Sequence, residues 1–165
     1  ELHDRTGHTT VFVTHDQEEA LELSDRLCVM SQGRIEQVGT PDTVYDQPTS
    51  PFVFGFIGES STLPVTIENN EVWVGGRAIG VPAGDAKPGN AQLFFRPHDV
   101  DLIEGDASLA GVVSASRRVG GTRRVELDIG GDGHKVEVDL PFDHPAGDRT
   151  RLAFRPRRWK LFPAA

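Results

Sequence analysis

The sequence predicts an α+β protein, in which a segment of alternating strands and helices is followed by a small all-β domain. Up to about residue 58, apolar strand-like runs alternate with segments that begin with helix-capping residues. Beyond that point, short runs of alternating polar and apolar residues follow one another, separated by turns rich in glycine and asparagine. Such a series of short strands is typical of a small barrel or a sandwich. We therefore expect two domains, residues 1–58 and residues 59–165.

The first expected strand and helix lie on either side of His15. Residues 9–14 (TTVFVT) form a β-branched and aromatic run, which predicts a strand buried on both faces, as in a parallel sheet. Asp16, with Glu19 three residues later, is a capping-box pair and predicts a helix over residues 17–26. The expected inner-face residues of this helix are Ala20, Leu21 and Leu23.

A hairpin and two short helices complete the first domain. Residues 27–30 (LCVM) and the alternating residues 34–38 predict antiparallel strands, joined by a tight turn at Gln32 and Gly33. Thr40 and Ser50 are each followed by a proline, the pattern of an N-cap with proline at the first helical position. We expect one helix to end near residue 47 and the other, residues 52–57, to end at Gly58.

The all-β region is expected to contain only strands and turns, without an amphipathic helix. Its expected strands are Leu63–Glu68, Val72–Val74, Ala91–Phe95, Val100–Ile103, Leu109–Ser116, Arg124–Ile129, Lys135–Leu140, Arg151–Arg155 and Trp159–Phe162. The turn signals between them are residues 69–70 (NN), 75–76 (GG), 87–89 (KPG), 120–121 (GG) and 130–133 (GGDG).

Charge and composition exclude several classes of protein. Residues 1–58 carry three basic and ten acidic side chains, a net charge of −7, and residues 59–165 carry 14 and 15, a net charge of −1, which together give −8. The acidic first third argues against a nucleic-acid-binding surface there. No apolar run reaches the roughly 18–20 residues that span a bilayer. Cys28 is a single cysteine, so neither a disulfide nor a cysteine-based zinc site is expected, and a reducing, cytoplasmic setting fits.

Four stretches carry a resemblance to a known family. Residues 10–20 (TVFVTHDQEEA) resemble the segment around the switch histidine of ABC-transporter ATPases, and residues 23–41 are similar to its continuation in importers. Residues 52–58 (FVFGFIG) resemble the helix that leads into the importers' C-terminal regulatory domain. Residues 93–100 (LFFRPHDV) resemble a strand of that domain, in a form closest to sulfate/thiosulfate importers.

The resemblance implies a fold and a function for each domain. Residues 1–58 would be the C-terminal remnant of the α/β ABC ATPase domain, and residues 59–165 a small OB-like barrel, a regulatory domain of the TOBE type. His15 would be the switch histidine, which senses the γ-phosphate of ATP and helps to place the attacking water. The implied cofactors are ATP and Mg²⁺, and the implied partners are a second ATPase subunit in a homodimer and the transmembrane permease subunits. The implied location is the cytoplasmic face of the membrane, and the implied solute is sulfate or thiosulfate.

The chain lacks the sequence motifs that bind and hydrolyse ATP. No G-x-x-x-x-G-K-[ST] phosphate loop, no LSGG-like signature and no apolar strand ending in an Asp-Glu pair is present. In the family these motifs precede the switch histidine, and Glu1–Arg5 read as the end of a helix, which we interpret as a start within a longer protein. We therefore expect the fragment alone to bind no nucleotide and to have no ATPase activity, with no bound cofactor or metal.

A glycine turn between arginines offers an alternative function. Arg117, Arg118, Arg123 and Arg124 flank Gly120-Gly121, and their guanidinium groups are candidates to bind a sulfate-like anion in an oxyanion-sensing module. The ordinary interpretation of the same arginines is a solvated hairpin tip.

A second basic cluster, residues 149–160, includes Phe154 and Trp159 and resembles the stacking surface of an OB-fold that binds single-stranded nucleic acid. We expect Phe154 to face the core instead, and we expect no nucleic-acid binding. The histidines have no metal-ligand spacing.

Overall fold

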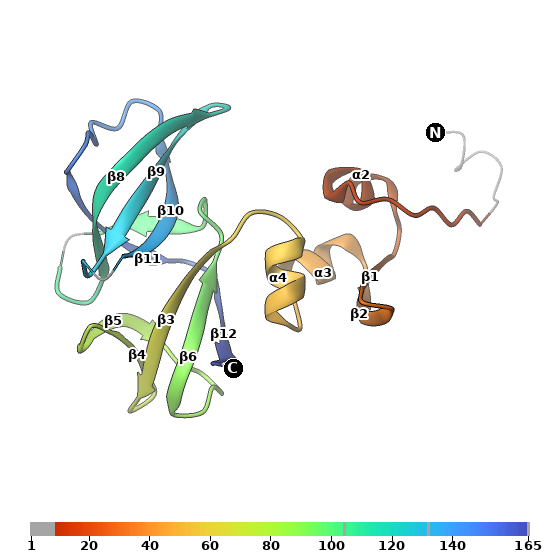
Figure 1. Cartoon of the computed structure of the whole chain (residues 1–165), viewed down its shortest axis with the longest axis horizontal. Helices are drawn as coiled ribbons and strands as arrows, with labels where there is room; N and C mark the ends of the chain where they lie inside the picture. Colours follow the sequence, from red (N-terminus) through yellow and green to blue (C-terminus); the bar gives the residue numbers. More distant parts are fainter. Residues whose placement is uncertain (1–8, 104, 132, 165) are drawn as a thin grey trace. The chain divides into compact units, whose positions relative to one another are not determined.

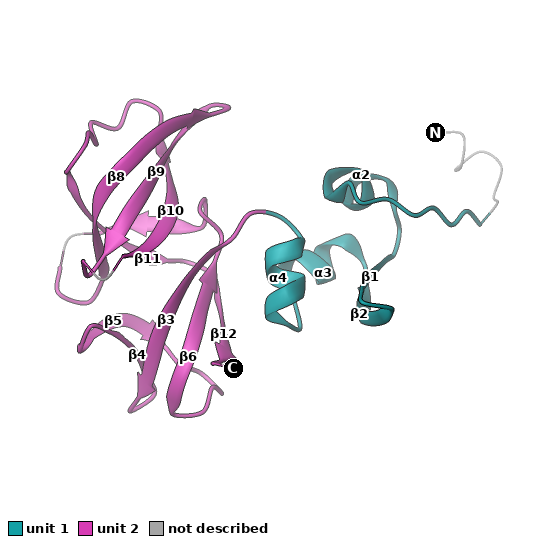
Figure 2. Ribbon diagram, in the orientation of Figure 1, with its two compact units in different colours: residues 1–58 teal, residues 59–165 magenta. Residues whose placement is uncertain are grey.

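The computed structural model describes residues 9–103, 105–131 and 133–164. These residues form two compact units, residues 1–58 and residues 59–165, which Figure 2 shows in different colours. The expected helix end at residues 1–5 lies outside the described residues. In the described part of the chain, no helix is long and apolar enough to cross a membrane.

The described residues of the first unit, from residue 9 onward, form a hairpin and three short helices, which Figure 1 labels. The hairpin turns at Gln32 and Gly33, whose φ angles of 47° and 74° are the left-handed pair that a tight type I′ turn requires. This confirms the predicted hairpin. The buried apolar cluster of this unit consists of Leu27, Val29, Val44, Val53 and Ile57. The elements are α2 (Gln17–Leu23), β1 (Leu27–Ser31), β2 (Arg34–Gly39), α3 (Pro41–Asp46) and α4 (Pro51–Phe56).

The helices begin at the predicted caps. The side chain of Thr40 accepts a hydrogen bond from the N–H of Thr43, and that of Ser50 accepts one from the N–H of Val53. At α2 the carboxylate of Asp16 accepts from the N–H of Glu19 at 3.1 Å. These contacts satisfy backbone donors that a helix start leaves free. Helix α2 ends at Leu23 and is therefore three residues shorter than expected. Leu23 was expected on the inner face of this helix, but it is 68% exposed and does not face the core.

The strand predicted over residues 9–14 is absent from the structure. The side chains of Val11 and Val13 are 88% and 98% exposed, and Phe12 is 43% exposed. A β-strand is held by hydrogen bonds to neighbouring strands, so an apolar run without neighbours does not form one. The described residues contain no strand that pairs with this segment. The prediction was wrong for this chain because it assumed flanking strands.

The second unit consists of two five-stranded antiparallel sheets, in the orders β10-β9-β8-β11-β7 and β12-β6-β3-β4-β5. The strands of the first sheet are β7 (Val100–Leu102), β8 (Leu109–Val119), β9 (Thr122–Ile129), β10 (His134–Pro141) and β11 (Arg151–Pro156). Those of the second are β3 (Ser61–Glu68), β4 (Glu71–Val74), β5 (Arg77–Pro82), β6 (Gly89–Phe95) and β12 (Trp159–Pro163). This all-β arrangement is consistent with an OB-like domain.

The two sheets share one apolar core. Phe95 on β6 and Phe154 on β11 are fully buried, and their ring centroids lie 5.8 Å apart. Ser61 on β3 joins the sheets by a pair of hydrogen bonds: its hydroxyl donates to the carbonyl of Glu137 on β10 and accepts from the same residue's N–H, both at 2.8 Å. The burial of Phe154 confirms the expectation that it faces the core.

Strand β5 was missed by the sequence prediction. Its six residues include Gly80, with φ +69°, and Pro82, and glycine and proline are depleted in strands. A Cβ at position 80 would lie 2.7 Å from the guanidinium of Arg155 and 2.8 Å from the carbonyl oxygen of Ala107. The glycine is therefore needed where β5 passes close to the loop before β8, an approach that the local sequence does not reveal.

Candidate functional site

His15 stands on an exposed segment immediately before α2. The residues on either side of it are tied together: the hydroxyl of Thr14 donates to the carboxylate of Glu19 at 2.7 Å and accepts from the N–H of Asp16 at 3.0 Å. Among the described residues, the imidazole of His15 has no hydrogen-bond partner. The segment thus presents a histidine side chain whose ring nitrogens are available to an external group.

The four arginines around Gly120-Gly121 do not converge on a common point. They face each other in register across the β8–β9 hairpin, Arg117 opposite Arg124 and Arg118 opposite Arg123. Arg118 donates to the carbonyl of Gly120 at 3.0 Å, with its guanidinium 4.6 Å from the ring centre of Phe142.

The other arginines of the hairpin also have partners within the chain. Arg123 donates to the carbonyl of Ala146 at 3.3 Å, and Arg117 forms an ion pair of 2.8 Å with Glu137. These three guanidinium groups make separate contacts within the chain and are not brought together at one point, so anion binding at this turn stays a prediction.

Arg124 is the centre of a buried ion-pair network instead. Its side chain is 4% exposed and donates two hydrogen bonds to the carboxylate of Asp139, at 2.7 and 2.8 Å. A further nitrogen of the guanidinium contacts the carboxylate of Glu59, the first residue of the second unit. The hydrogen bonds and charges of Asp139 and Glu59 outweigh the effect of burial and raise the pKa of Arg124 above its usual value. A guanidinium neutralised in this way is not available to an exogenous anion.

The residues 93–100 that carry the resemblance perform a structural task. Arg96 is 4% exposed and donates to the carbonyl of Glu59 at 2.9 Å. Asp99, whose side chain is 9% exposed, accepts from Arg158 at 3.0 Å. The motif therefore connects the turn after β6 to the start of the domain and to the turn between β11 and β12.

The basic cluster at residues 149–160 is partly occupied by internal contacts. Arg157 donates to the carbonyl of His98 at 2.9 Å and lies 3.6 Å from Asp101, and Arg155 donates to the carbonyl of Ala107 at 2.6 Å. With Phe154 buried, the cluster lacks one of the two rings that a stacking surface would use. In the described part of the chain, no three histidine, cysteine or acidic side chains are grouped so that they could hold a metal ion.

Comparisons with known proteins show what the chain is similar to. Residues 104–157 match the model of a TOBE-like domain. The chain is 68% identical, over 100% of its length, to the sulfate/thiosulfate import ATP-binding protein CysA of Mesorhizobium japonicum, of which it covers 48%. The whole chain is a relative of the C-terminal part of sulfate/thiosulfate import ATP-binding proteins.

Further relatives agree with this assignment. The corresponding protein of Brucella melitensis biotype 1 is 65% identical over 99% of the chain, and one from Rhizobium meliloti is 63% identical over 98%. The chain covers 46% and 45% of these two proteins, so it spans about half the length of the curated relatives that it matches.

The sequence interpretation overlooked the buried polar residues that organise the second unit. Arg124 was grouped with its neighbours by spacing, although its partner Asp139 follows in the next strand. The alternation of β9 gave no signal for it. In the run 123–129 (RRVELDI), Arg123 shares the apolar face with Val125, Leu127 and Ile129, so alternation places Arg124 on the opposite, polar face. Arg124 and Asp139 are opposite each other because of the register between β9 and β10, and this register is known only from the tertiary structure.

Proposed function

We propose that this chain is the C-terminal part of the ATP-hydrolysing subunit of an ABC importer for an inorganic anion, sulfate or thiosulfate. The observation that carries the proposal is the similarity along the whole chain to sulfate/thiosulfate import ATP-binding proteins, with 68% identity in the first comparison. In this proposal residues 1–58 complete the ATP-binding domain, and residues 59–165 form its regulatory and dimerisation domain.

His15 is the proposed catalytic contribution of this chain. An imidazole donor close to the terminal phosphate would hold the γ-phosphoryl group and orient the attacking water, a task of positioning and charge stabilisation. The imidazole has no hydrogen-bond partner in the part of the chain that the structure describes, and hydrogen bonds fix Thr14 and Asp16 on either side of it. Both observations support this role. In this proposal, the residues that bind the other phosphates and Mg²⁺ lie in the half of the relatives' length that this chain does not cover.

The exposed apolar side chains of the first unit also support the proposal. Val11, Phe12 and Val13 form a continuous apolar run that suits a strand buried on both faces, and they are exposed in this chain. Burying three such side chains would contribute on the order of 5 kcal/mol, at ~1.5–3 kcal/mol each. A neighbouring sheet from the ATP-binding half of the protein would supply that cover and complete the α/β domain, of which this unit would be the remnant.

The complete protein would use ATP and Mg²⁺, act as a homodimer and sit at the cytoplasmic face of the membrane through its permease partners. These features follow from the importer proposal. The chain's own contribution to them is the switch-histidine segment and the β-domain.

A hybrid protein tests the proposal. The C-terminal part of the Mesorhizobium japonicum relative is replaced by residues 1–165 of this chain, and the hybrid is expressed in cells that lack their own sulfate-import ATP-binding subunit. We expect growth with sulfate as the only sulfur source, and Mg²⁺-dependent ATP hydrolysis by the purified hybrid. The substitution His15→Ala should lower the ATPase rate by roughly 10²-fold or more, in the range of a positioned proton-transfer or water-orienting group.

His98→Gln is the matched control, since His98 is also a half-exposed histidine and lies 3.9 Å from Asp99, outside the nucleotide segment. Its ATPase rate should equal that of the unmodified hybrid. A hybrid that hydrolyses ATP equally well with and without His15 would remove the switch role. A hybrid that is active but supports growth only on another transported solute would overturn the sulfate assignment.

A further inference from the structure

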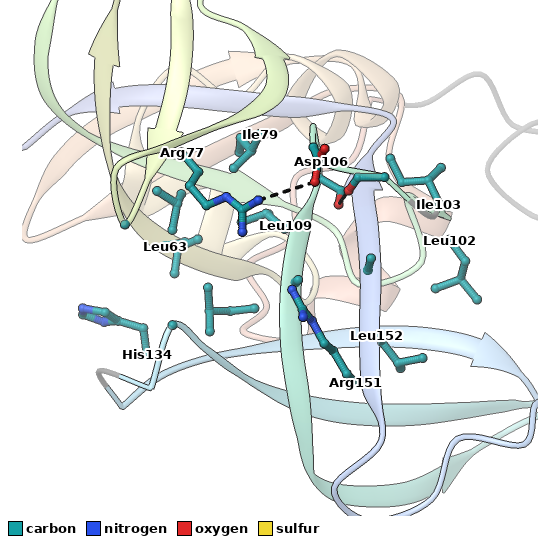
Figure 3. Close-up of a pocket in the computed structure, with 18 of the residues that line it drawn as sticks. Leu63, Arg77, Ile79, Leu102, Ile103, Asp106, Leu109, His134, Arg151 and Leu152 are labelled. Carbon is teal, nitrogen blue, oxygen red and sulfur yellow. Dashed lines mark hydrogen bonds and ion pairs between the residues drawn. The ribbon is translucent and has the colours of Figure 1, made fainter.

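A wide pocket opens in the second unit, between strands of the two sheets. Its volume is about 880 Å³, within the ~300–1,000 Å³ typical of sites for small organic ligands. Figure 3 shows most of its lining residues, which come from strands of both sheets, among them β3, β5, β7, β8, β10 and β11, and from the loop between β7 and β8. Of the sequence features described above, the basic cluster at residues 149–160 contributes Arg151 to the lining, and two of the turn signals contribute Gly75 and Gly130.

The floor of the pocket is apolar. Val74, Ile103 and Ala153 are half-buried and line it with apolar atoms, and Leu102 at its side is 40% exposed. Leu63, Ile79 and Leu109 also line it, but each is at most 2% exposed and offers almost no surface to a ligand. An inorganic oxyanion needs polar donors on all sides and gains nothing from such surface. The floor suits the hydrocarbon part of an organic molecule.

The rim of the pocket is positively charged. Arg77 lies 3.5 Å from Asp106, and both side chains are well exposed, at 66% and 103%. Arg151 and His134 also line the pocket, and among the described residues neither side chain has a hydrogen-bond or ion-pair partner. In Figure 3 the side chains of Arg77 and Arg151 both extend toward the middle of the pocket. Among the described lining residues, one carboxylate, that of Asp106, accompanies two guanidinium groups, and it pairs with Arg77 rather than with Arg151.

The loop at the mouth of the pocket is held in place from behind. The hydroxyl of Ser108 donates to the carbonyl of Gly105 at 2.8 Å, and Arg155 donates to the carbonyl of Ala107 at 2.6 Å. Gly80 allows β5 to approach this loop, because a Cβ there would meet both Arg155 and Ala107. These contacts hold the loop that carries the lining residues Gly105, Asp106 and Ser108, which lowers the ordering cost of binding.

We propose that this pocket binds a soluble organic anion with an apolar body, such as a medium-chain carboxylate. The head group pairs with Arg151 and Arg77, and the hydrocarbon part covers the apolar floor between the sheets. This proposal does not rest on the transport function, because the site lies wholly within residues 59–165 and its test uses the chain alone.

Titration of the ¹⁵N-labelled chain with butanoate, hexanoate and octanoate tests the proposal. We expect saturable amide shifts at Ser108, Gly130 and Ala153, which line the pocket. Each added methylene should tighten the dissociation constant by up to about fourfold, the equivalent of burying one CH₂. Octan-1-ol, which has the same chain without the charge, should bind at least about tenfold more weakly, since a charge-assisted hydrogen bond is lost.

Two variants and one matched control separate the head-group and chain contributions. Arg151→Gln should weaken octanoate binding by about tenfold or more, and Leu102→Ser should weaken octanoate more than butanoate. Lys87→Gln removes the same charge from an exposed turn that does not line the pocket, and it should leave the dissociation constant unchanged.

Three results would overturn the proposal. The first is that sulfate and octanoate shift the same amide signals equally. The second is that Lys87→Gln and Arg151→Gln weaken octanoate binding equally. The third is that the chain co-sediments with phosphatidylglycerol vesicles under conditions where octanoate shifts no amide signals. The last result would assign the charged rim to a membrane lipid.

Discussion

Replacement of Arg124 by methionine should strongly destabilise the β-domain. Methionine has a similar length and no charge, so Arg124→Met removes the guanidinium while largely keeping the volume of the side chain. The substitution leaves Asp139, whose side chain is 9% exposed, without the two hydrogen bonds of 2.7 and 2.8 Å that it now accepts. The neighbouring Glu59 would also lose its contact, but it is 62% exposed and water can solvate it.

The magnitude follows from the burial of the surviving carboxylate. Breaking a buried ion pair by removing one partner costs about 3–5 kcal/mol, because an uncompensated charge remains in the interior. In a domain of about 100 residues this lowers the melting temperature by on the order of 10 °C or more. Asp139→Asn in the same background removes the stranded charge, so the double variant should recover a substantial part of the loss, on the order of 2 kcal/mol of coupling.

Tryptophan fluorescence during urea unfolding measures this effect in the β-domain alone. Both tryptophans of the chain, Trp73 and Trp159, lie in that domain, so the first unit does not contribute to their signal. Arg117→Met is the matched control: Arg117 faces Arg124 across the hairpin, but it is 61% exposed in its pair with Glu137. An exposed pair contributes at most ~1 kcal/mol. Equal destabilisation by the two substitutions would refute the argument that burial makes the Arg124 network important.

Two further perturbations test other parts of the β-domain. Gly111→Ala would place a Cβ 2.8 Å from Ile129 and should lower the free energy of unfolding by about 1–3 kcal/mol through overpacking, whereas Gly121→Ala has open space and should change it by less than ~1 kcal/mol in the same urea assay. The hydrogen bond from Lys135, at 2.7 Å, lowers the pKa of Glu126 below its ordinary value, so Lys135→Met should raise that pKa in an NMR titration. Because the folded-state pKa is the lower one, the stability from this pair is present above the ordinary carboxyl pKa and is lost as the pH falls through the folded value. An unchanged Glu126 titration would show that the ion pair does not persist in solution.

Much of the local structure could be predicted because it depends on residues close together in the chain. Thr40 and Ser50 cap their helices with their own side chains, and Gln32-Gly33 adopts the left-handed turn for which glycine is suited. Most strands of the β-domain also appeared in the alternation of the sequence. The ends of some strands were misplaced. Strand β8, for example, was expected to end at Ser116, but it continues to Val119 because it pairs with β9 up to that residue, and the polar residues near Arg117 show no alternation that would indicate this.

The functional residues were predictable to different degrees. His15 was singled out by the resemblance of its neighbourhood, and its role stays a prediction. The roles of Arg96, Arg124 and Asp99 could not be deduced from spacing, since their partners lie in other strands or turns. The pocket beside Arg151 was equally hidden, because its walls come from segments that are distant in sequence.

The sequence by itself determined the caps, the hairpin turn, most strands and the relationship to the ATP-binding subunits, because these depend on short-range geometry and on residue identity. Only the tertiary structure decided which arginines are neutralised in the interior, why β5 needs Gly80, and that residues 9–14 remain without a sheet in this chain. The reason is physical: a buried charge needs a counter-charge and a strand edge needs hydrogen-bond partners. Which residues provide them depends on the order and register of the strands in the sheets.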